Sequence, residues 1–238
     1  MPAKSGVTPP QAPSAPPDWS GLWLPDIKDQ MKQIRSNPIP WTETAASEIA
    51  AMEIEEEAGR PRGLFVNCLP QGMPSWMLIT HNAIEFLLTP GRVTILGEGD
   101  GNRLRRIYVD GRLHPDNVDP SFHGHSIGRW ENDVLVVDTI AVRPETYIAV
   151  SEAVGLPNNS DVHITEHIHL TNPDTLVFEM TITAPHVMTA PWKTTRIFHR
   201  DHNPHDEIVE GTCLEGRFRS TTDEHGNSVF VPLPDEEP

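Results

Sequence analysis

Phe122-His-Gly-His-Ser-Ile-Gly-Arg-Trp-Glu-Asn-Asp-Val-Leu-Val-Val-Asp-Thr139 is the stretch that decides the fold of this chain. Asn132-Asp133 is a two-residue turn signal between two runs that have the composition of strands. The stretch therefore predicts a β-hairpin. Pairing Glu131 with Val134 fixes the register of every residue behind the turn.

This register gives the hairpin two chemically different faces, because successive residues of a strand point to opposite sides. Trp130, Leu135 and Val137 make one face the better candidate for the core. The other face carries an imidazole, a guanidinium and a carboxylate: His125, Arg129 and Asp138. These groups suit either an acid–base site or a solvated surface. Only strand twist, a bulge near Gly128 or a covering layer would turn this second face into a pocket.

The composition of the whole chain excludes several classes of partner. The 238 residues carry a formal net charge of −16, which argues against binding to nucleic acid or to an anionic membrane. No apolar run is long enough to cross a bilayer. We therefore expect a small-molecule ligand or substrate. The oligomeric state stays open, with a homodimer as one option.

The two ends of the chain read as extensions of one domain. Residues 1–17 are rich in Pro and Ala and predict a disordered leader, 18–219 form the folded domain, and 220–238 form an acidic tail. The compartment is not determined: the chain as written suits the cytoplasm, and removal of a signal peptide would indicate the periplasm. Cys68 and Cys213 are two ordinary thiols or one long-range disulfide.

Two short helices are expected before the strands begin. Apolar residues spaced by a helical period predict one over 26–36, with Asp26 as its N-cap. Thr42 can cap a second helix running from Glu43 to Ala58. The glutamates near the end of this second helix are interpreted as a solvated face.

From residue 60 onward, turn signals recur about every 8–12 residues between short apolar runs. The predicted strands include Arg92 to Gly97, Arg103 to Val109, Val162–Leu170, Thr175–Thr183 and Glu207–Arg219. We expect an all-β fold: a single antiparallel, lipocalin-like β-barrel of about ten strands with one or two short N-terminal helices. A β-sandwich is the alternative.

Glu166 stands out in the strand 162–170, because it falls on the apolar face of that strand. Matching this face to the apolar face of 175–183 requires an odd hairpin loop or a bulge. Buried among apolar side chains, Glu166 must find a partner or raise its pKa. It is therefore either a general acid or base, or half of a buried ion pair that only holds strands together.

The strand 103–109 offers the partner for Glu166. Arg105 and Arg106 lie on opposite faces of this strand, so either orientation places one arginine beside apolar residues. Tyr108 shares the face of Arg106 and would serve as a proton donor or a substrate clamp. An arginine stacked on Tyr108 at the barrel rim is the alternative.

The 12 histidines invite a metal interpretation. The pattern at His123-Gly-His125 lacks the nearby glutamate of a cupin site, and His163 and His167 share a strand face with His169. The metal hypothesis uses His123, His125, His163 and His167 as ligands of a transition metal. The alternative is a polar outer surface of the sheet, and no cofactor is predicted.

Several phrases resemble a family of largely uncharacterised bacterial proteins over roughly 18–219. They are Cys68-Leu-Pro-x-Gly-Met-Pro74, Thr89-Pro-Gly-Arg-Val-Thr-Ile95, Arg105-Arg-Ile-Tyr-x-Asp-Gly-Arg112 with His114-Pro115, and Gly124-His-Ser-Ile-Gly-x-Trp-Glu131 with Leu135-Val-Val-Asp-Thr139. In this family an arginine often follows the residue matching Glu166, where this chain has His167. The resemblance implies one barrel-like domain and no defined reaction.

Gly21-Leu22-Trp23 resembles the G-x-W start of lipocalin-like (calycin) barrels, in which the tryptophan plugs one end of the barrel. That class includes carriers as well as cofactor-independent lyases, isomerases and hydratases. The leading hypothesis is accordingly an enzyme that moves a proton on a mostly apolar, oxygenated small molecule in the barrel mouth. A non-catalytic carrier and a metal-dependent enzyme are the alternatives.

The hypothesis assigns roles to nine residues. His125 acts as base or acid, Asp138 orients it, and Glu166 or Tyr108 is the complementary group. A guanidinium holds a developing oxyanion. The expected substrate-binding residues are Arg105, Arg106, His114, Trp130 and Phe178.

Overall fold

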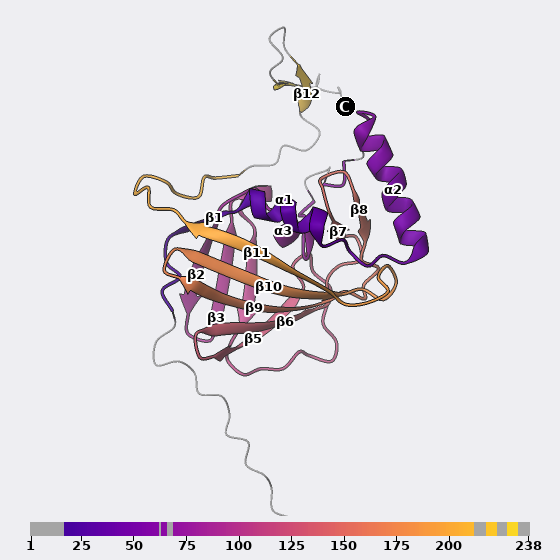
Figure 1. Cartoon of the computed structure of the whole chain (residues 1–238). Helices are drawn as coiled ribbons and strands as arrows, with labels where there is room; N and C mark the ends of the chain where they lie inside the picture. Colours follow the sequence, from indigo (N-terminus) through magenta and orange to yellow (C-terminus); the bar gives the residue numbers. More distant parts are fainter. Residues whose placement is uncertain (1–16, 62, 66–68, 212–217, 223–227, 233–238) are drawn as a thin grey trace, which may run out of the picture.

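The computed structural model describes residues 17–61, 63–65, 69–211, 218–222 and 228–232. Nine strands form one closed barrel (Figure 1): β1 (Leu22–Pro25), β2 (Ile84–Thr89), β3 (Arg92–Gly97), β4 (Leu104–Tyr108), β5 (His125–Glu131), β6 (Val134–Ile140), β9 (His163–Asn172), β10 (Thr175–Thr183) and β11 (Trp192–Arg200). Two small sheets pair β7 (Tyr147–Ala149) with β8 (Gly155–Pro157), and β12 (Phe218–Thr222) with β13 (Ser228–Pro232). The helices are α1 (Ile27–Ser36), α2 (Glu43–Glu57), α3 (Ser75–Leu78) and α4 (Gly99–Asn102).

The barrel confirms an all-β architecture but corrects the expected strand directions and number. Each barrel strand pairs with the next barrel strand along the chain, and β11 closes the ring onto β1. Strand direction must return to itself around a closed ring, so nine strands cannot all pair antiparallel. The β4–β5 pair is accordingly parallel, while the other eight pairs are antiparallel. The prediction of purely antiparallel pairing is wrong, and the barrel has nine strands where about ten were predicted.

The parallel pair has a consequence for the surface of the barrel. Two parallel strands cannot be joined by a tight turn, so the chain needs a long crossover between them. Residues 109–124 form this crossover, which brings His114 against the outer faces of β5 and β6. β4 and β5 pair only at Ile107–Ser126 and Tyr108–Ile127.

The predicted hairpin register is confirmed at every position from Glu131–Val134 to His125–Ile140. Its register is continuous through Gly128, so no bulge interrupts the hairpin there. The β9–β10 hairpin contains the predicted irregularity: Thr175 pairs with Asn172, whereas Leu176 pairs with Leu170. This shift keeps the apolar faces of both strands inside the barrel.

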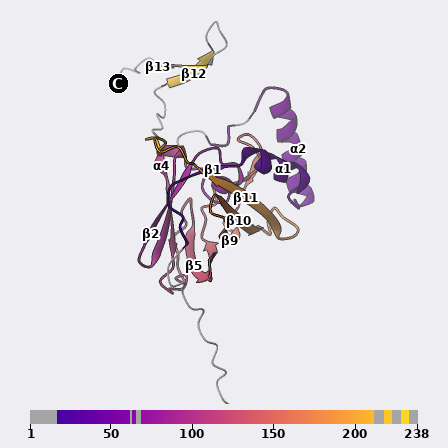
Figure 2. The ribbon, with the colours of Figure 1, turned by 60° about the vertical axis from the view of Figure 1, so that its left-hand side comes forward.

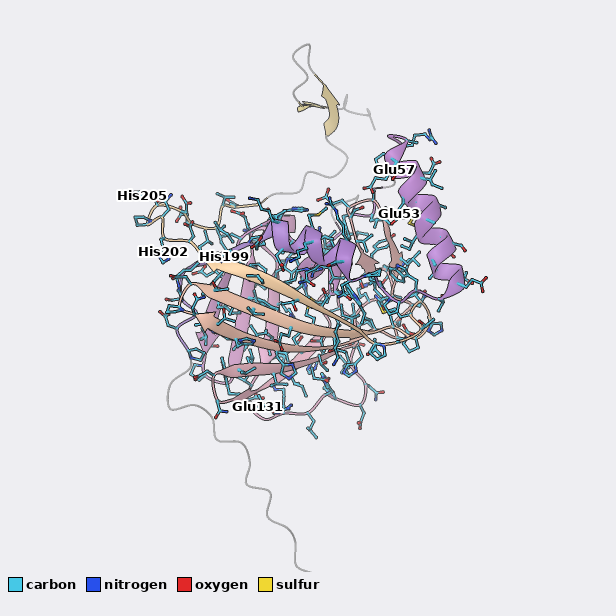
Figure 3. All side chains as sticks on the ribbon, viewed as in Figure 1. Glu53, Glu57, Glu131, His199, His202 and His205 are labelled. Carbon is cyan, nitrogen blue, oxygen red and sulfur yellow. The ribbon has the colours of Figure 1, made fainter. Side chains whose placement is uncertain are left out.

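Both predicted N-terminal helices are present with their predicted caps. Asp26 accepts a hydrogen bond from the backbone of Asp29, and Thr42 caps α2 in the same way. α1 lies along β11 (Figures 1 and 2). Glu53 and Glu57, labelled on α2 in Figure 3, are exposed, as a solvated face requires.

The predicted strand Glu207–Arg219 is wrong over its first part. Residues 207–211 are not part of a strand and bond to α4 and to Glu98, the residue before it. Val209 N–H donates to Glu98 Oε1 at 3.2 Å, and Gly211 N–H donates to Asn102 Oδ1 at 2.6 Å. Cys68 and Cys213, whose pairing was left open, lie outside the described residues.

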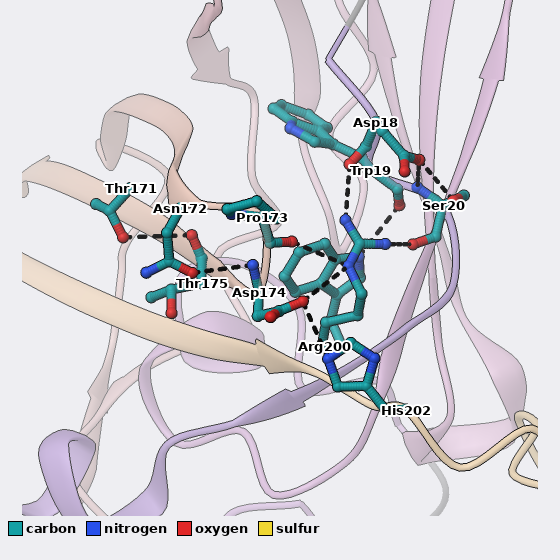
Figure 4. Close-up of polar contacts among 11 residues, drawn as sticks. Asp18, Trp19, Ser20, Thr171, Asn172, Pro173, Asp174, Thr175, Arg200 and His202 are labelled. Carbon is teal, nitrogen blue, oxygen red and sulfur yellow. Dashed lines mark hydrogen bonds and ion pairs between the residues drawn. The ribbon is translucent and has the colours of Figure 1, made fainter.

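One end of the barrel is closed around Trp23, which is fully buried. Arg200 lies over its ring at 4.4 Å and donates hydrogen bonds to the backbone carbonyls of Asp18, Ser20 and Pro173 (Figure 4). One guanidinium thus ties the segment before β1 to the β9–β10 turn. In the described part of the chain, no helix is long and apolar enough to span a bilayer.

Candidate functional site

Arg105 and Glu166 form an ion pair inside the barrel, and both side chains are fully buried. Arg105 Nη1 donates to Glu166 Oε1 at 2.9 Å, and Nη2 donates to Glu166 Oε2. The same Nη2 reaches Thr139 Oγ1 at 3.0 Å, and Thr139 bonds Ser126 at 2.8 Å. Each polar group therefore compensates the burial of the next.

A second polar cluster covers the outer face of β5 and β6, and the crossover contributes its central residue. His114 Nδ1 lies 2.8 Å from His125 Nδ1, and His114 Nε2 lies 2.9 Å from Asp138 Oδ1. The other oxygen of Asp138 lies 2.8 Å from His163 Nε2. We call His125, His114 and Asp138 the imidazole array.

The available hydrogen-bond donors and acceptors determine which nitrogens of the imidazole array carry protons. An ionised Asp138 only accepts, so His114 carries its proton on Nε2. The remaining nitrogen of a neutral His114, Nδ1, must then accept the proton carried by His125 Nδ1. This leaves Nε2 of His125 with a lone pair, which is the form of a general base.

The surroundings favour the neutral form of His125. Burial lowers its pKa, and the electrostatic effects of the adjacent His114 and Arg112 side chains lower it further. Tyr108 stacks on the His125 ring at 5.6 Å, and Arg112 lies 4.0 Å above the Tyr108 ring. His125 thus sits between a phenol and a second imidazole.

A pocket of about 540 Å³ opens where β4 diverges from the segment that leads into β5. Its rim contains Arg106, Tyr108 and His125, and its deeper wall contains His123 and Ser126. The remaining lining residues are Pro70, Gly101, Asn102, Arg103, Leu104, Ser121, Phe122 and Gly124. The lining includes two arginines and no carboxylate, so its described residues carry positive charge on a strongly acidic chain.

Gly124 lets His123 and His125 line this pocket at different depths. In a regular strand these two residues would share a face. Gly124 instead has a φ of +68°, and a Cβ there would meet Ile140 O at 2.7 Å. His123 consequently packs against Trp76, with ring centroids 4.9 Å apart, while His125 remains on the outer face.

The predicted site residues separate into two groups. His125, Asp138, Tyr108 and His114 come together on the outer face, and Arg106 lines the adjoining pocket. The others are internal: Glu166 and Arg105 pair with each other, Phe178 is fully buried against Phe198, and Trp130 packs against Trp19. The expected contact between His125 and Asp138 runs through His114.

The four histidines of the metal hypothesis do not converge. His123 is deep in the pocket, His125 bonds His114, His163 bonds Asp138, and His167 lines a separate surface pocket with Glu179. Among the described residues, no group of three or more His, Cys, Asp or Glu side chains is arranged to hold a metal ion.

Sequence reasoning missed two contributors to the site. Arg112 covers Tyr108, although its position beside His114 in one motif was a usable signal. The orientation of His123 depends on the backbone at Gly124, for which the His-Gly-His pattern was the only hint. A scan against protein-family models and a search of curated proteins both find no match to this chain.

Proposed function

We propose that this chain is a cofactor-independent enzyme that moves a proton on an oxygenated small molecule. The observation that carries the proposal is the imidazole array, which presents a neutral His125 at the rim of a positively charged pocket. The reaction class is elimination, hydration or isomerisation, because each begins with the removal or addition of a proton beside an oxygenated carbon.

In this proposal His125 Nε2 takes the proton. The charge then passes to His114, since the proton on His125 Nδ1 can move to His114 Nδ1 over 2.8 Å. Asp138 stabilises the resulting imidazolium of His114. Arg106 binds the developing oxyanion, and Tyr108 returns a proton on the same side of the pocket.

Glu166 has a structural part in this proposal. Its carboxylate is held by two hydrogen bonds from Arg105 and does not line the pocket. The pair instead fixes Thr139 and Ser126, and Ser126 forms the deep wall. Arg105 therefore helps to position Ser126 in the pocket wall without lining the pocket itself.

The lipocalin-like assignment of the barrel belongs to the proposal as well. Its support is the Gly21-Leu22-Trp23 start, with Trp23 buried at a closed end of the barrel. The chain departs from that class at the parallel β4–β5 pair, since lipocalin barrels close with antiparallel strands. A lipocalin-type carrier would bind a ligand without converting it, so turnover separates the two functions.

The test follows proton exchange by ¹H NMR in D₂O on a panel of 2-hydroxy, 3-hydroxy and 2-oxo carboxylates. We expect the protein to catalyse loss of a C–H signal from at least one compound. His125→Gln should lower this rate by about 10²–10⁴-fold, the usual contribution of a general base. His114→Gln should lower it less, because His125 keeps its lone pair.

His167→Gln is the matched control, since His167 is an exposed histidine of the same barrel outside the imidazole array. Its rate should equal that of the unmodified chain. Full exchange activity in His125→Gln would refute the assignment of the base. Saturable binding without exchange of any compound would favour the carrier.

A further inference from the structure

His123 is the one deep histidine of the pocket lining, and both of its ring nitrogens are buried without a hydrogen-bond partner among the described residues. Burial lowers its pKa to about 3, and the charges of Arg105 and Arg103 add to this effect. The ring is therefore neutral at physiological pH, with one N–H donor and one acceptor nitrogen.

Two unsatisfied nitrogens in one buried ring cost free energy of folding. A buried polar group without a partner calls for an explanation, and one explanation is a functional role toward a ligand. The neighbours of His123 do not relieve this cost, because Trp76 packs against the ring at 4.9 Å as an aromatic edge contact. A hydroxyl suits whichever ring nitrogen faces the ligand, because it can donate to the acceptor nitrogen or accept from the N–H.

The charged and apolar residues of the pocket lining indicate which other groups the ligand carries. Arg103 and Arg106 line it, no Asp or Glu does, and Phe122 and Leu104 add apolar surface. A negatively charged group is attracted there although the whole chain carries −16. Arg106 and His123 line the same pocket, so one small ligand can place an anionic group on the arginine and a hydroxyl on the histidine.

We propose that the pocket binds a small organic anion with a hydroxyl group beside its carboxylate, and that His123 recognises the hydroxyl. The carboxylate lies on Arg106, and the apolar remainder of the ligand contacts Phe122 and Leu104. This inference rests on the proposed function and specifies its substrate class as a 2-hydroxy acid. His123 is a specificity residue in this scheme, while His125 performs the proton transfer.

Three probes of similar size test the two recognition elements by isothermal titration calorimetry. Mandelate has both a carboxylate and a 2-hydroxyl, phenylacetate lacks the hydroxyl, and 1-phenylethane-1,2-diol lacks the charge. We expect mandelate to bind at least about 10-fold more tightly than either analogue, because a hydrogen bond to a buried polar group is reserved for it. Equal affinity for mandelate and phenylacetate, or no saturable binding of mandelate, would overturn the proposal.

His123→Phe keeps a ring of similar shape and removes both nitrogens. This variant should bind mandelate and phenylacetate equally, and its Tm should be at least that of the unmodified chain. A lower Tm with unchanged discrimination would show a structural histidine and refute the proposal. His123→Leu is the second variant, and it should lose the same discrimination.

His169→Phe is the control, since His169 is a partly buried histidine outside the pocket. It should retain the preference for mandelate. His125→Gln should also retain this preference while losing proton exchange. Failure of the proposed function therefore appears as exchange that survives His125→Gln, whereas failure of this inference appears as missing hydroxyl discrimination.

Discussion

The buried pair of Arg105 and Glu166 joins β4 to β9 across the interior of the barrel. A buried charge whose partner is removed keeps its desolvation cost and loses its compensation. Removing one partner would therefore destabilise the fold, because the other charge would stay buried without a counter-charge. The sequence indicated both residues, because each strand has an alternating apolar face that contains one charged side chain.

We predict that Glu166→Gln lowers the free energy of unfolding by about 3–5 kcal/mol, because Arg105 would remain buried without a counter-charge. Urea denaturation provides the measurement. Glu131→Gln is the control: Glu131 pairs with Arg129 at the exposed hairpin tip, labelled in Figure 3, and its loss should cost less than about 1 kcal/mol. Equal costs for the two variants would contradict the prediction.

Arg112 influences the titration of His125 from outside the pocket. A nearby positive charge disfavours protonation, so Arg112→Gln should raise the pKa of His125 toward its usual value. The acid limb of the activity profile would move to higher pH in the same variant. Imidazole ¹³C–¹H NMR titration measures the shift directly.

Arg129→Gln is the matched control for Arg112→Gln. Both arginines are exposed and pair with a carboxylate two residues away, but Arg129 contributes no shift to the pKa of His125. The His125 titration should be unchanged in this variant. A lower His125 pKa in Arg112→Gln would show that the sign of the argument is wrong.

At the scale of elements, local features were predictable and the meeting of distant strands was not. The hairpin register of β5 and β6 follows from a two-residue turn and side-chain alternation, and both are local. The parallel β4–β5 pair depends on how many strands close the ring, which no local pattern encodes. The sequence consequently predicts His114 only as a substrate-binding residue, and its contact with His125 and Asp138 could not be predicted.

The same limit applies to the two histidines around Gly124. Alternation alone would place His123 and His125 on one face, and a positive φ separates them. The sequence shows that position 124 is a glycine, which can adopt a left-handed conformation. Whether it does so is decided by the packing around it. The side-chain alternation of its own strand placed Glu166 inside the barrel. Its absence from the pocket lining could not be predicted, because it follows from the ion pair with Arg105.

Arg200 closes one end of the barrel through a planar set of donors (Figure 4). We predict that Arg200→Lys lowers the free energy of unfolding by about 1–3 kcal/mol, because an ammonium cannot reach three carbonyls in the geometry of a guanidinium fork. Arg143→Lys, at an exposed pair with Glu145, should change it by less than about 0.5 kcal/mol. Chemical denaturation measures the free energy of unfolding of both variants and tests this difference.

At the scale of the whole molecule, the net charge of −16 opposes compaction. We predict that Tm rises as sodium chloride increases from about 20 to 500 mM, since salt screens repulsion between exposed carboxylates. The double variant Glu53→Gln, Glu57→Gln should raise Tm at low salt and reduce the salt dependence. Differential scanning fluorimetry measures both effects, and a Tm that falls with salt would contradict the argument.

The odd number of barrel strands also constrains how this architecture can vary. A β-hairpin gained or lost changes the ring by two strands, so the number of strands stays odd and at least one parallel pair must remain. Gain or loss of a single strand makes the parity even and allows every neighbour to run antiparallel. The crossover would then be unnecessary, and His114 would lose the path that carries it to His125. The imidazole array thus depends on the parallel pair that an odd number of strands requires, and a hairpin added away from β4, β5 and β6 would leave the array in place.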